Sequence, residues 1–400
     1  ALKGKGVKIN EINTTFNAQI QNVEFNGVNI SEIYANGILA EQAFNGSITC
    51  LDSNFDIEFN GDIDFNKELP LYNFETDIHH INLSNLKLYQ VKADVQGKTL
   101  DEMFGEVILD DIVYSQGGVD YPIKKTTLHV EQEADNKHIL LNAGGLTVTA
   151  EGSFQYKNIV PAFQNQLHQY LPSLIPANAA EKPEDYVYQV ASLNVDLQEE
   201  IPLLKLFVPN YILENKTKLN AYLDESKNEL MIEASIDTLA LKNQMLTDIH
   251  LTMESTEDSC LEAHGNIGGY QLKRNDTLND VNNIDLEAKI KNNDISFLLN
   301  LQGNDNNQLE NILLEGVVGF ASAKNVAITL NNGSVVWDSQ VFLLDTFNRV
   351  TITPENIHVD NFGMTSAPNK SLSIYSRVNE RAEDVIMFDF NNIELGIANF

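Results

Sequence analysis

Cysteine is scarce in this sequence, and its scarcity excludes several classes of protein. Cys50 and Cys260 are the two cysteines among 400 residues, and they lie far apart. The chain therefore has no disulfide framework and no CxxC or zinc-ligand spacing. A single disulfide between the two residues stays open, and cysteine usage does not fix the redox compartment.

Basic residues are also few. The chain has 26 Lys and Arg against 57 Asp and Glu, which gives a formal net charge of −31. Such a surface repels phosphate backbones, so we expect no nucleic acid partner and no electrostatic docking on anionic lipid headgroups. An acidic surface also has a simpler use, because it keeps a β-rich protein soluble.

Long apolar runs are missing as well. No run approaches the roughly 18 residues that a membrane-spanning helix needs. The first residues, ALKGKGVKINEI, match neither a signal peptide nor an anchor. Because the chain opens and closes (IELGIANF) in a strand-like pattern, we expect a piece of a longer protein whose targeting elements lie outside it.

Catalytic and metal-binding motifs are absent too. The sequence contains no GxSxG, P-loop or HExxH motif. His79 and His80 would point to opposite faces of a strand, so they are poorly placed to share a metal. Carboxylate pairs such as Asp62 and Asp64 fit a solvated acidic face. We therefore predict no enzyme activity, no catalytic residues, no metal and no cofactor.

What the sequence does contain is strands with one apolar face, clearest between Phe55 and Leu88. Apolar residues alternate there with acidic and polar ones, which places the two kinds on opposite faces of a sheet. Asn60-Gly61 predicts a type I′ hairpin turn inside this stretch, since both central residues of that turn need a positive φ. Asn-Gly recurs at residues 26–27, 36–37 and 45–46, which predicts further turns between short strands.

The texture changes between residues 157 and 216, which hold six of the ten prolines. Such a concentration marks an interruption of the sheet. The spacing of its apolar residues predicts a short amphipathic helix over Pro161–Leu171, with Pro161 in its first turn and Pro172 ending it. Residues 201–207 (IPLLKLF) predict a second short helix, and residues 193–197 predict a strand. We divide the chain into a first β-groove segment (1–156), this interruption (157–216) and a second β-groove segment (217–400) that continues the same sheet.

One-sided strands throughout predict an all-β fold. Parallel sheets that are covered on both faces need near-continuous apolar runs, which are scarce here. Several sandwich domains would show more than one linker-like break. We therefore favour one long curved antiparallel sheet with one or two short helices. The apolar face of this sheet forms a groove. For each lining residue, an ordinary closed β-core is the alternative. The predicted lining residues are Phe55, Ile57, Phe59, Ile63, Phe65, Leu146, Val148, Phe154, Leu230, Ile232, Ile236, Ile284, Leu286, Ile290, Phe297 and Leu299, and the predicted groove cap is Phe163, Leu167 and Tyr170.

Several stretches resemble TamB-like proteins of the AsmA-like group. GSFQYKNIVPAFQNQLHQYLPSLIP is similar to a strand and short helix of that group. IPLLKLFVPNYILENKTKLNAYLDESKNELMIEASI is similar to its short helix, proline-hydrophobic stretch and alternating strands. The stretch from Phe55 and the end, LSIYSRVNERAEDVIMFDFNNIELGI, also resemble it. The resemblance covers most of the chain and rests on texture and order. The group's N-terminal anchor and C-terminal domain are lacking, which predicts a middle fragment.

The resemblance implies a β-groove, or β-taco, in the periplasm of a diderm bacterium, anchored to the inner membrane through sequence outside this piece. It implies that phospholipids are the cargo, and that an outer-membrane barrel protein is a partner. Burial of acyl chains gains about 0.8 kcal/mol per CH₂, and lipid transport needs no catalytic residue. Two alternatives stay open. One is a scaffold for outer-membrane protein assembly, which would pair with strands at its sheet edges; the other is a structural or adhesive β-rich protein.

Overall fold

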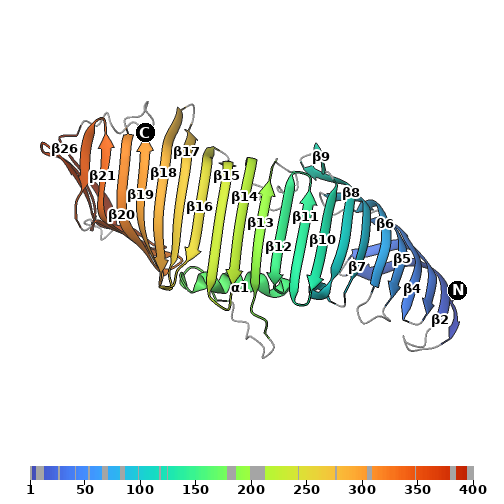
Figure 1. Ribbon diagram of the computed structural model, residues 1–400. Coiled ribbons are helices and arrows are strands. Elements are labelled where there is room, and N and C mark those ends of the chain that lie inside the picture. Colours follow the sequence, from blue (N-terminus) through green and yellow to red (C-terminus); the bar gives the residue numbers. More distant parts are fainter. Residues whose placement is uncertain are drawn as a thin grey trace. The chain divides into compact units, whose positions relative to one another are not determined.

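The computed structural model describes residues 2–5, 13–25, 28–40, 42–52, 55–64, 71–81, 86–97, 99–116, 119–123, 125–177, 186–198, 212–241, 243–274, 277–303, 309–346, 348–378 and 384–393 (Figure 1). The chain divides into two compact units. Unit 1 comprises Ala1–Tyr156 and Ala191–Asn210, and unit 2 comprises Lys157–Val190 and Tyr211–Phe400. The proline-rich interruption is thus shared between them.

Unit 1 is an antiparallel sheet. Its elements are β1 (Leu2–Lys5), β2 (Asn13–Phe25), β3 (Val28–Ala40), β4 (Ala43–Leu51), β5 (Phe55–Asp64), β6 (Leu71–Ile81), β7 (Leu86–Gln96), a 3-10 turn η1 (Leu100–Glu102), β8 (Phe104–Gln116), β9 (Val119–Ile123), β10 (Thr126–Glu133), β11 (Asn136–Ala143), β12 (Leu146–Ser153) and nearly all of β13 (Val190–Leu197). Strands β1 to β8 each pair with the next in sequence. β8 then pairs with both β9 and β10, and β11 and β12 continue the sheet. β13 runs beside β12, because the Gln198 N–H donates to the Gly145 carbonyl oxygen at 2.8 Å.

Unit 2 is also an antiparallel sheet, and it includes nearly all of the one α-helix in the described residues. Its elements are α1 (Tyr156–His168), β14 (Ile212–Asp224), β15 (Glu229–Leu241), β16 (Gln244–Ser255), β17 (Leu261–Arg274), β18 (Thr277–Lys291), β19 (Asp294–Gly303), β20 (Leu309–Ser322), β21 (Asn325–Trp337), β22 (Gln340–Leu344), β23 (Asn348–Ile352), β24 (Ile357–Ser366), β25 (Lys370–Val378) and β26 (Asp384–Asn391). Strands β14 to β21 pair in sequence order. β22 and β23 both lie between β21 and β24, and β25 and β26 complete the sheet.

The fold-class prediction is confirmed. Within the described residues the chain is nearly all β, every strand pairing is antiparallel, and the helices are α1 and η1. The alternation of apolar and polar residues is the cause, because it suits a pleated sheet with one apolar face. The predicted strand at 193–197 is confirmed as part of β13.

Three of the predicted turns are wrong. Gly37, Gly46 and Gly61 lie inside β3, β4 and β5, where Gly46 pairs directly with both of the others. Residues 55–64 therefore form one strand and not a hairpin that turns at Asn60-Gly61. Glycine is present for a steric reason, since a β-carbon on Gly37 would lie 2.5 Å from the backbone oxygen of Asn45. The Asn-Gly pair at 26–27 lies outside the described residues.

The predicted helix exists, but its bounds are wrong. α1 begins at Tyr156, so Pro161 lies inside it and not in its first turn, and it ends at His168. The early start has a tertiary cause: the Asp101 carboxylate accepts a 2.7 Å hydrogen bond from the Tyr156 N–H, a donor that the helix itself leaves without a partner. The second predicted helix, at 201–207, lies outside the described residues.

Helix α1 packs across strand ends of unit 2 (Figure 1). Ala162 of the helix and Tyr170 just after it are buried in one cluster with strand residues. Polar contacts fix this position. The Gln166 side-chain amide donates to the Asn228 carbonyl oxygen (2.7 Å), and the Asn293 N–H donates to the Tyr170 carbonyl oxygen (2.9 Å). The helix is therefore attached to two of the strand-to-strand turns.

Candidate functional site

Residues that face one another across the strands of unit 1 form rows without charge. One row runs in direct register from Phe16 on β2 to Val148 on β12, and a further row lies two residues away on either side. We call the three rows the unit 1 band. The rows are Thr14, Leu39, Phe44, Ile63, Tyr72, Val95, Gly105, Val130, Ile139 and Ala150; Phe16, Gly37, Gly46, Gly61, Phe74, Ala93, Val107, Leu128, Leu141 and Val148; and Ala18, Ala35, Ile48, Phe59, Thr76, Val91, Leu109, Thr126, Ala143 and Leu146.

The unit 1 band is only partly shielded from water. In its central row Ala93 is buried and the other members are half-buried, and Ile48 of the neighbouring row is 38% exposed. A single-layer sheet produces this state, because neighbours shield one another from the sides while solvent reaches them from above. With about 4.8 Å between strands and about 7 Å between rows, the band is roughly 40 Å long and 14 Å wide.

Glycines and phenylalanines make the β2–β6 part of the band unusual. Gly37, Gly46 and Gly61, which we call the glycine row, stand next to one another in the central row. Backbones approach so closely here that a β-carbon on Gly46 would lie 2.7 Å from the Gly37 Cα. Close approach on one face is what a sheet curled toward that face produces.

Four phenyl rings form a series over the glycine row. The centroids of Phe16 and Phe44 are 6.0 Å apart, those of Phe44 and Phe59 are 6.4 Å apart, and those of Phe59 and Phe74 are 5.2 Å apart. Their planes incline by 28°, 30° and 39°, within the range of offset aromatic contacts. We call these four residues the phenylalanine ladder.

Unit 2 has a band of the same kind, which we call the unit 2 band. Its three rows also lack charged side chains, and most of their members are half-buried. Leu286 is the most exposed of its large residues, at 40%. The rows are Thr217, Ile236, Ile249, Ile267, Ile284, Leu301, Ile312, Val335 and Phe342; Leu219, Ala234, Leu251, Gly265, Leu286, Leu299, Leu314 and Gly333; and Ala221, Ile232, Met253, Ala263, Ala288, Phe297, Gly316 and Leu330.

Helix α1 borders the unit 2 band along one side. Ile232 and Met253 of the band pack against the buried cluster under the helix, together with Phe163 and Leu167 of the helix itself. The buried members of that cluster are Ala162, Tyr170, Leu223, Leu230, Leu261 and Ile290. The band thus meets a closed hydrophobic core at this side.

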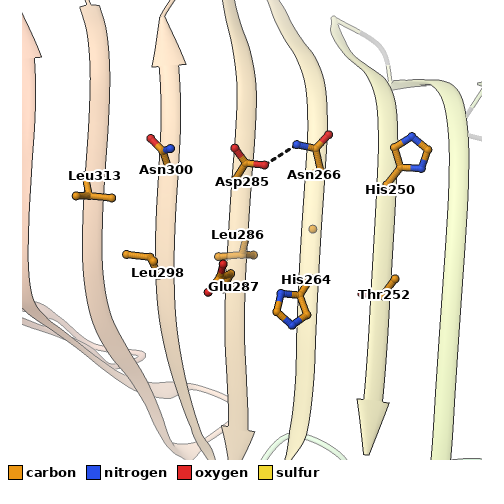
Figure 2. Close-up of a pocket in the computed structure, with 11 residues that line it drawn as sticks. His250, Thr252, His264, Asn266, Asp285, Leu286, Glu287, Leu298, Asn300 and Leu313 are labelled. Atoms are coloured by element: carbon orange, nitrogen blue, oxygen red, sulfur yellow. Dashed lines mark hydrogen bonds between the residues drawn. The ribbon is translucent and has the colours of Figure 1, made fainter.

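The opposite face of the same strands is polar and carries a shallow hollow of about 480 Å³. Figure 2 shows its upper row, in which His250, Asn266, Asp285 and Asn300 lie on successive strands β16 to β19. The Asn266 side-chain amide donates to the Asp285 carboxylate, as the dashed line in Figure 2 marks. Leu298, at 38% exposure, also lines the hollow. Charge and hydrogen-bonding capacity are therefore separated from the uncharged band by the thickness of one sheet.

Two buried polar contacts fix the ends of segments. In unit 2 the Tyr186 hydroxyl lies 3.0 and 2.9 Å from the two carboxylate oxygens of Glu225, a buried residue. Loss of hydration, followed by the hydrogen bond to Glu225, raises the pKa of Tyr186 to about 12. In unit 1 the buried Lys137 ammonium donates to the Phe154 carbonyl oxygen, lies 3.7 Å from Asp101, and sits 5.2 Å from the centroid of the Phe154 ring.

The structure brings most of the predicted lining residues into the two bands. Phe59, Ile63, Leu146 and Val148 belong to the unit 1 band, and Ile232, Ile236, Ile284, Leu286, Phe297 and Leu299 belong to the unit 2 band. Ile57 lies on the same face as Phe59, one position beyond the band, opposite Cys50.

The remaining predicted residues lie elsewhere. Leu230 and Ile290 are buried in the cluster that Tyr170 joins, and Phe163 and Leu167 pack against it. Phe154 is buried beside Lys137. Phe55 is in β5 but its side chain lies outside the described part, as does all of Phe65.

Sequence reasoning missed the phenylalanines other than Phe59, and the glycine row. The sequence does contain a signal, because hydrophobic residues stand two positions before and after each glycine, as Phe44 and Ile48 do around Gly46 and Phe59 and Ile63 do around Gly61. The alternation therefore continues through the Asn-Gly pairs, which by themselves predict turns. Cys50 and Cys260 are both free and buried, so the alternative of a disulfide between them is not realised.

The described residues contain no group of three or more His, Cys, Asp or Glu side chains placed to hold a metal ion. Among the helices of the described part, none has the length and apolar character to cross a membrane. No protein-family model, no curated protein and no solved structure matches this chain.

Proposed function

We propose that this chain is part of a TamB-like bridge between the two membranes of a diderm bacterium, and that its two bands hold phospholipid acyl chains on their way to the outer membrane. The observation that supports this is the register. Residues far apart in sequence line up into rows that run across β2–β8 and β10–β12 in unit 1 and across β14–β22 in unit 2, without one charged side chain.

The dimensions suit acyl chains. A bilayer core of about 30 Å contains two chains end to end, so one chain spans about 15 Å. A band of roughly 40 Å then has room for two to three chain lengths in line. A width of about 14 Å leaves space for the two tails of one phospholipid side by side.

The energetics suit passage as well as binding. Each methylene that leaves water gains about 0.8 kcal/mol. A tail that advances by one strand along a row meets another uncharged residue, so apolar contact is exchanged and not lost. In unit 2, helix α1 borders the band with Phe163 and Leu167 and closes that side. The charged headgroup stays in water at the open side.

The test compares charged substitutions on the two faces of the sheet. Ile48→Asp with Leu286→Asp places one carboxylate in each band, at residues that are 38% and 40% exposed. Ile38→Asp with Leu298→Asp is the matched control, because these residues are 49% and 38% exposed but lie on the opposite face. We expect native mass spectrometry and lipid extraction to find phospholipid on the wild type and the control, and at least tenfold less on the band variant. Circular dichroism checks that all three fold.

Equal phospholipid on both variants contradicts the proposal, because the face of the sheet would then not matter. A wild type that stays without lipid after incubation with phospholipid vesicles, combined with a band variant that unfolds, points to a closed core and to the structural alternative.

One observation favours the second candidate, a scaffold for outer-membrane protein assembly. In the described residues β26 pairs with β25 alone, in regular register over eight residues, and Phe388 and Phe390 are 57% and 47% exposed. β1, at the other end of the strand series, is four residues long and contains Lys3 and Lys5. Short, lysine-bearing edges resist pairing with other chains, whereas an eight-residue edge with exposed Phe388 and Phe390 is less protected, although Asp389 stands between these two. A wild type that binds an extended β-strand peptide but no lipid supports this function.

A further inference from the structure

We infer that the phenylalanine ladder is the place where the unit 1 band holds an acyl chain most firmly, so that it acts as a binding station within a band whose other large side chains, apart from Tyr72, are aliphatic. The inference rests on the proposed function. It assigns a role to Phe16, Phe44 and Phe74, which the sequence did not single out, and to the three glycines between them.

The rings lean over the glycine row. Phe44 Cε2 lies 3.1 Å from the position that a β-carbon on Gly37 would occupy, so the ring fills the space that glycine leaves. Each ring of the series is half-buried, and neighbouring centroids are 5.2 to 6.4 Å apart. The rings therefore form an almost continuous aromatic surface across β2 to β6 that is still reached by solvent.

The chemistry of this surface selects an apolar chain. β3, β4 and β5 each pair on both edges, so their backbone donors and acceptors are already used and offer nothing to a peptide strand. An α-helix is about 10 Å wide, which is broader than the single row of glycines. Charge excludes ionic ligands too, because the ladder is uncharged while Glu58 and Asp62 of β5 point to the other face. An acyl chain is narrow, uncharged and needs no hydrogen bonds.

The ladder also explains why this station would bind an acyl chain more firmly than the rest of the band does. An aromatic ring offers more contact area than an aliphatic side chain. The unit 2 band has phenylalanine only at Phe297 and Phe342, on different rows. A chain that lies on stacked rings makes more contacts per strand crossed than one that lies on leucine or isoleucine.

The test uses a photo-cross-linking amino acid at two positions of the whole chain. Position 63 lies on β5 directly opposite Phe44, and position 299 lies in the unit 2 band as the reference. The probe is a vesicle of phosphatidylethanolamine and phosphatidylglycerol with radiolabelled tails. We expect lipid adducts at both positions. The double variant Phe44→Leu with Phe59→Leu keeps the ladder apolar. It should lower the yield of lipid adduct at position 63 about tenfold, which corresponds to about 1.4 kcal/mol. The yield at position 299 should not change.

The possible outcomes separate this inference from the proposed function. Adducts at 299 but none at 63, or a leucine variant that cross-links at 63 as well as the wild type does, overturn the station and leave the proposed function standing. Adducts at neither position overturn both. Phe44→Ala with Phe59→Ala is a second variant, expected to lose at least as much as the leucine pair. If circular dichroism shows that the alanine variant is unfolded, the result from the leucine variant alone tests the binding station.

Discussion

Substitution of Gly46 should destabilise unit 1 strongly. A β-carbon there would lie 2.7 Å from the Gly37 Cα and closer still to the Asn36 carbonyl oxygen. Both are backbone atoms of a strand that is paired on its two edges, so neither can rotate away and the strands must separate. Overpacking of this kind costs typically 1–3 kcal/mol, and we expect Gly46→Ala to cost about 3 kcal/mol.

The matched control is Gly265→Ala, another glycine in the middle of a strand and on a band row. Its β-carbon would lie 3.9 Å from Leu251 Cδ1 and from Leu286 Cβ, which is ordinary contact. We expect no loss, or a gain of up to about 1 kcal/mol from reduced flexibility of the unfolded chain.

Urea unfolding followed by two probes measures both effects. Far-ultraviolet circular dichroism reports all strands, whereas fluorescence of Trp337, the sole tryptophan, reports β21 of unit 2. Gly46→Ala should lower the midpoint of the first signal with little effect on the second. If Gly46→Ala and Gly265→Ala unfold at the same urea concentration, the crowding of the glycine row is not real and the reasoning from it fails.

Two further predictions concern buried polar contacts. Because the pKa of Tyr186 is raised to about 12 by lost hydration and by Glu225, its neutral form is favoured in the folded state. The stability that this contact contributes is fully present below pH 10 and is lost as the pH rises through 12. The absorbance at 295 nm of the wild type, minus that of Tyr186→Phe, should therefore show one phenol that titrates near 12. A phenol that titrates near 10 contradicts this. Lys137→Met removes the ammonium that Phe154 and Asp101 surround, and hydrogen bonds to charged groups contribute about 1.5–3 kcal/mol. The circular dichroism midpoint in urea should fall accordingly, and an unchanged midpoint shows that this contact is dispensable.

The fold class could be predicted from the sequence because alternation is a local property. Leu230, Ile232, Ala234 and Ile236 share a face whatever they pair with, and so does each similar run. Proline content located the interruption for the same reason. Alternation and proline content are each visible within a few residues of sequence. A sheet of one-sided strands only requires that the alternation recurs from one strand to the next.

The boundaries of elements could not be predicted, since distant residues set them. Asp101 determines where α1 begins, although 55 positions separate it from Tyr156. The Asn-Gly pairs show the same limit. Asn-Gly favours a hairpin turn locally, but at Gly37, Gly46 and Gly61 it is the approach of neighbouring strands that requires glycine. Only the register reveals that the three stand side by side.

The register also explains why the candidate site could be predicted in part. Single strands show which residues are apolar, but a row exists only when the same face is presented in register by strand after strand. One residue of slip would place Glu58 where Phe59 now faces Ile48 and would introduce charge into the row. Rows that remain uncharged over so many consecutive pairings therefore depend on a constraint that acts across strands and not along them.

A closed core and an open apolar face both satisfy that constraint, and the two differ in how deeply the row members are buried. In a closed core the row members would be covered by a second layer and lie almost wholly out of water. That state is reached in the cluster under α1, where Leu230 and Leu261 are each 1% exposed, and at a minority of band positions, such as Ala143 and Leu146. Most of the other band members are half-buried, and Ile48 and Leu286 are the most exposed of them, at 38% and 40%. Side chains that are kept apolar in register, yet left half in water, gain the rest of their burial only when something apolar lies on them. Under the proposed function, an acyl chain that lies on a band would therefore stabilise the folded sheet by binding to it.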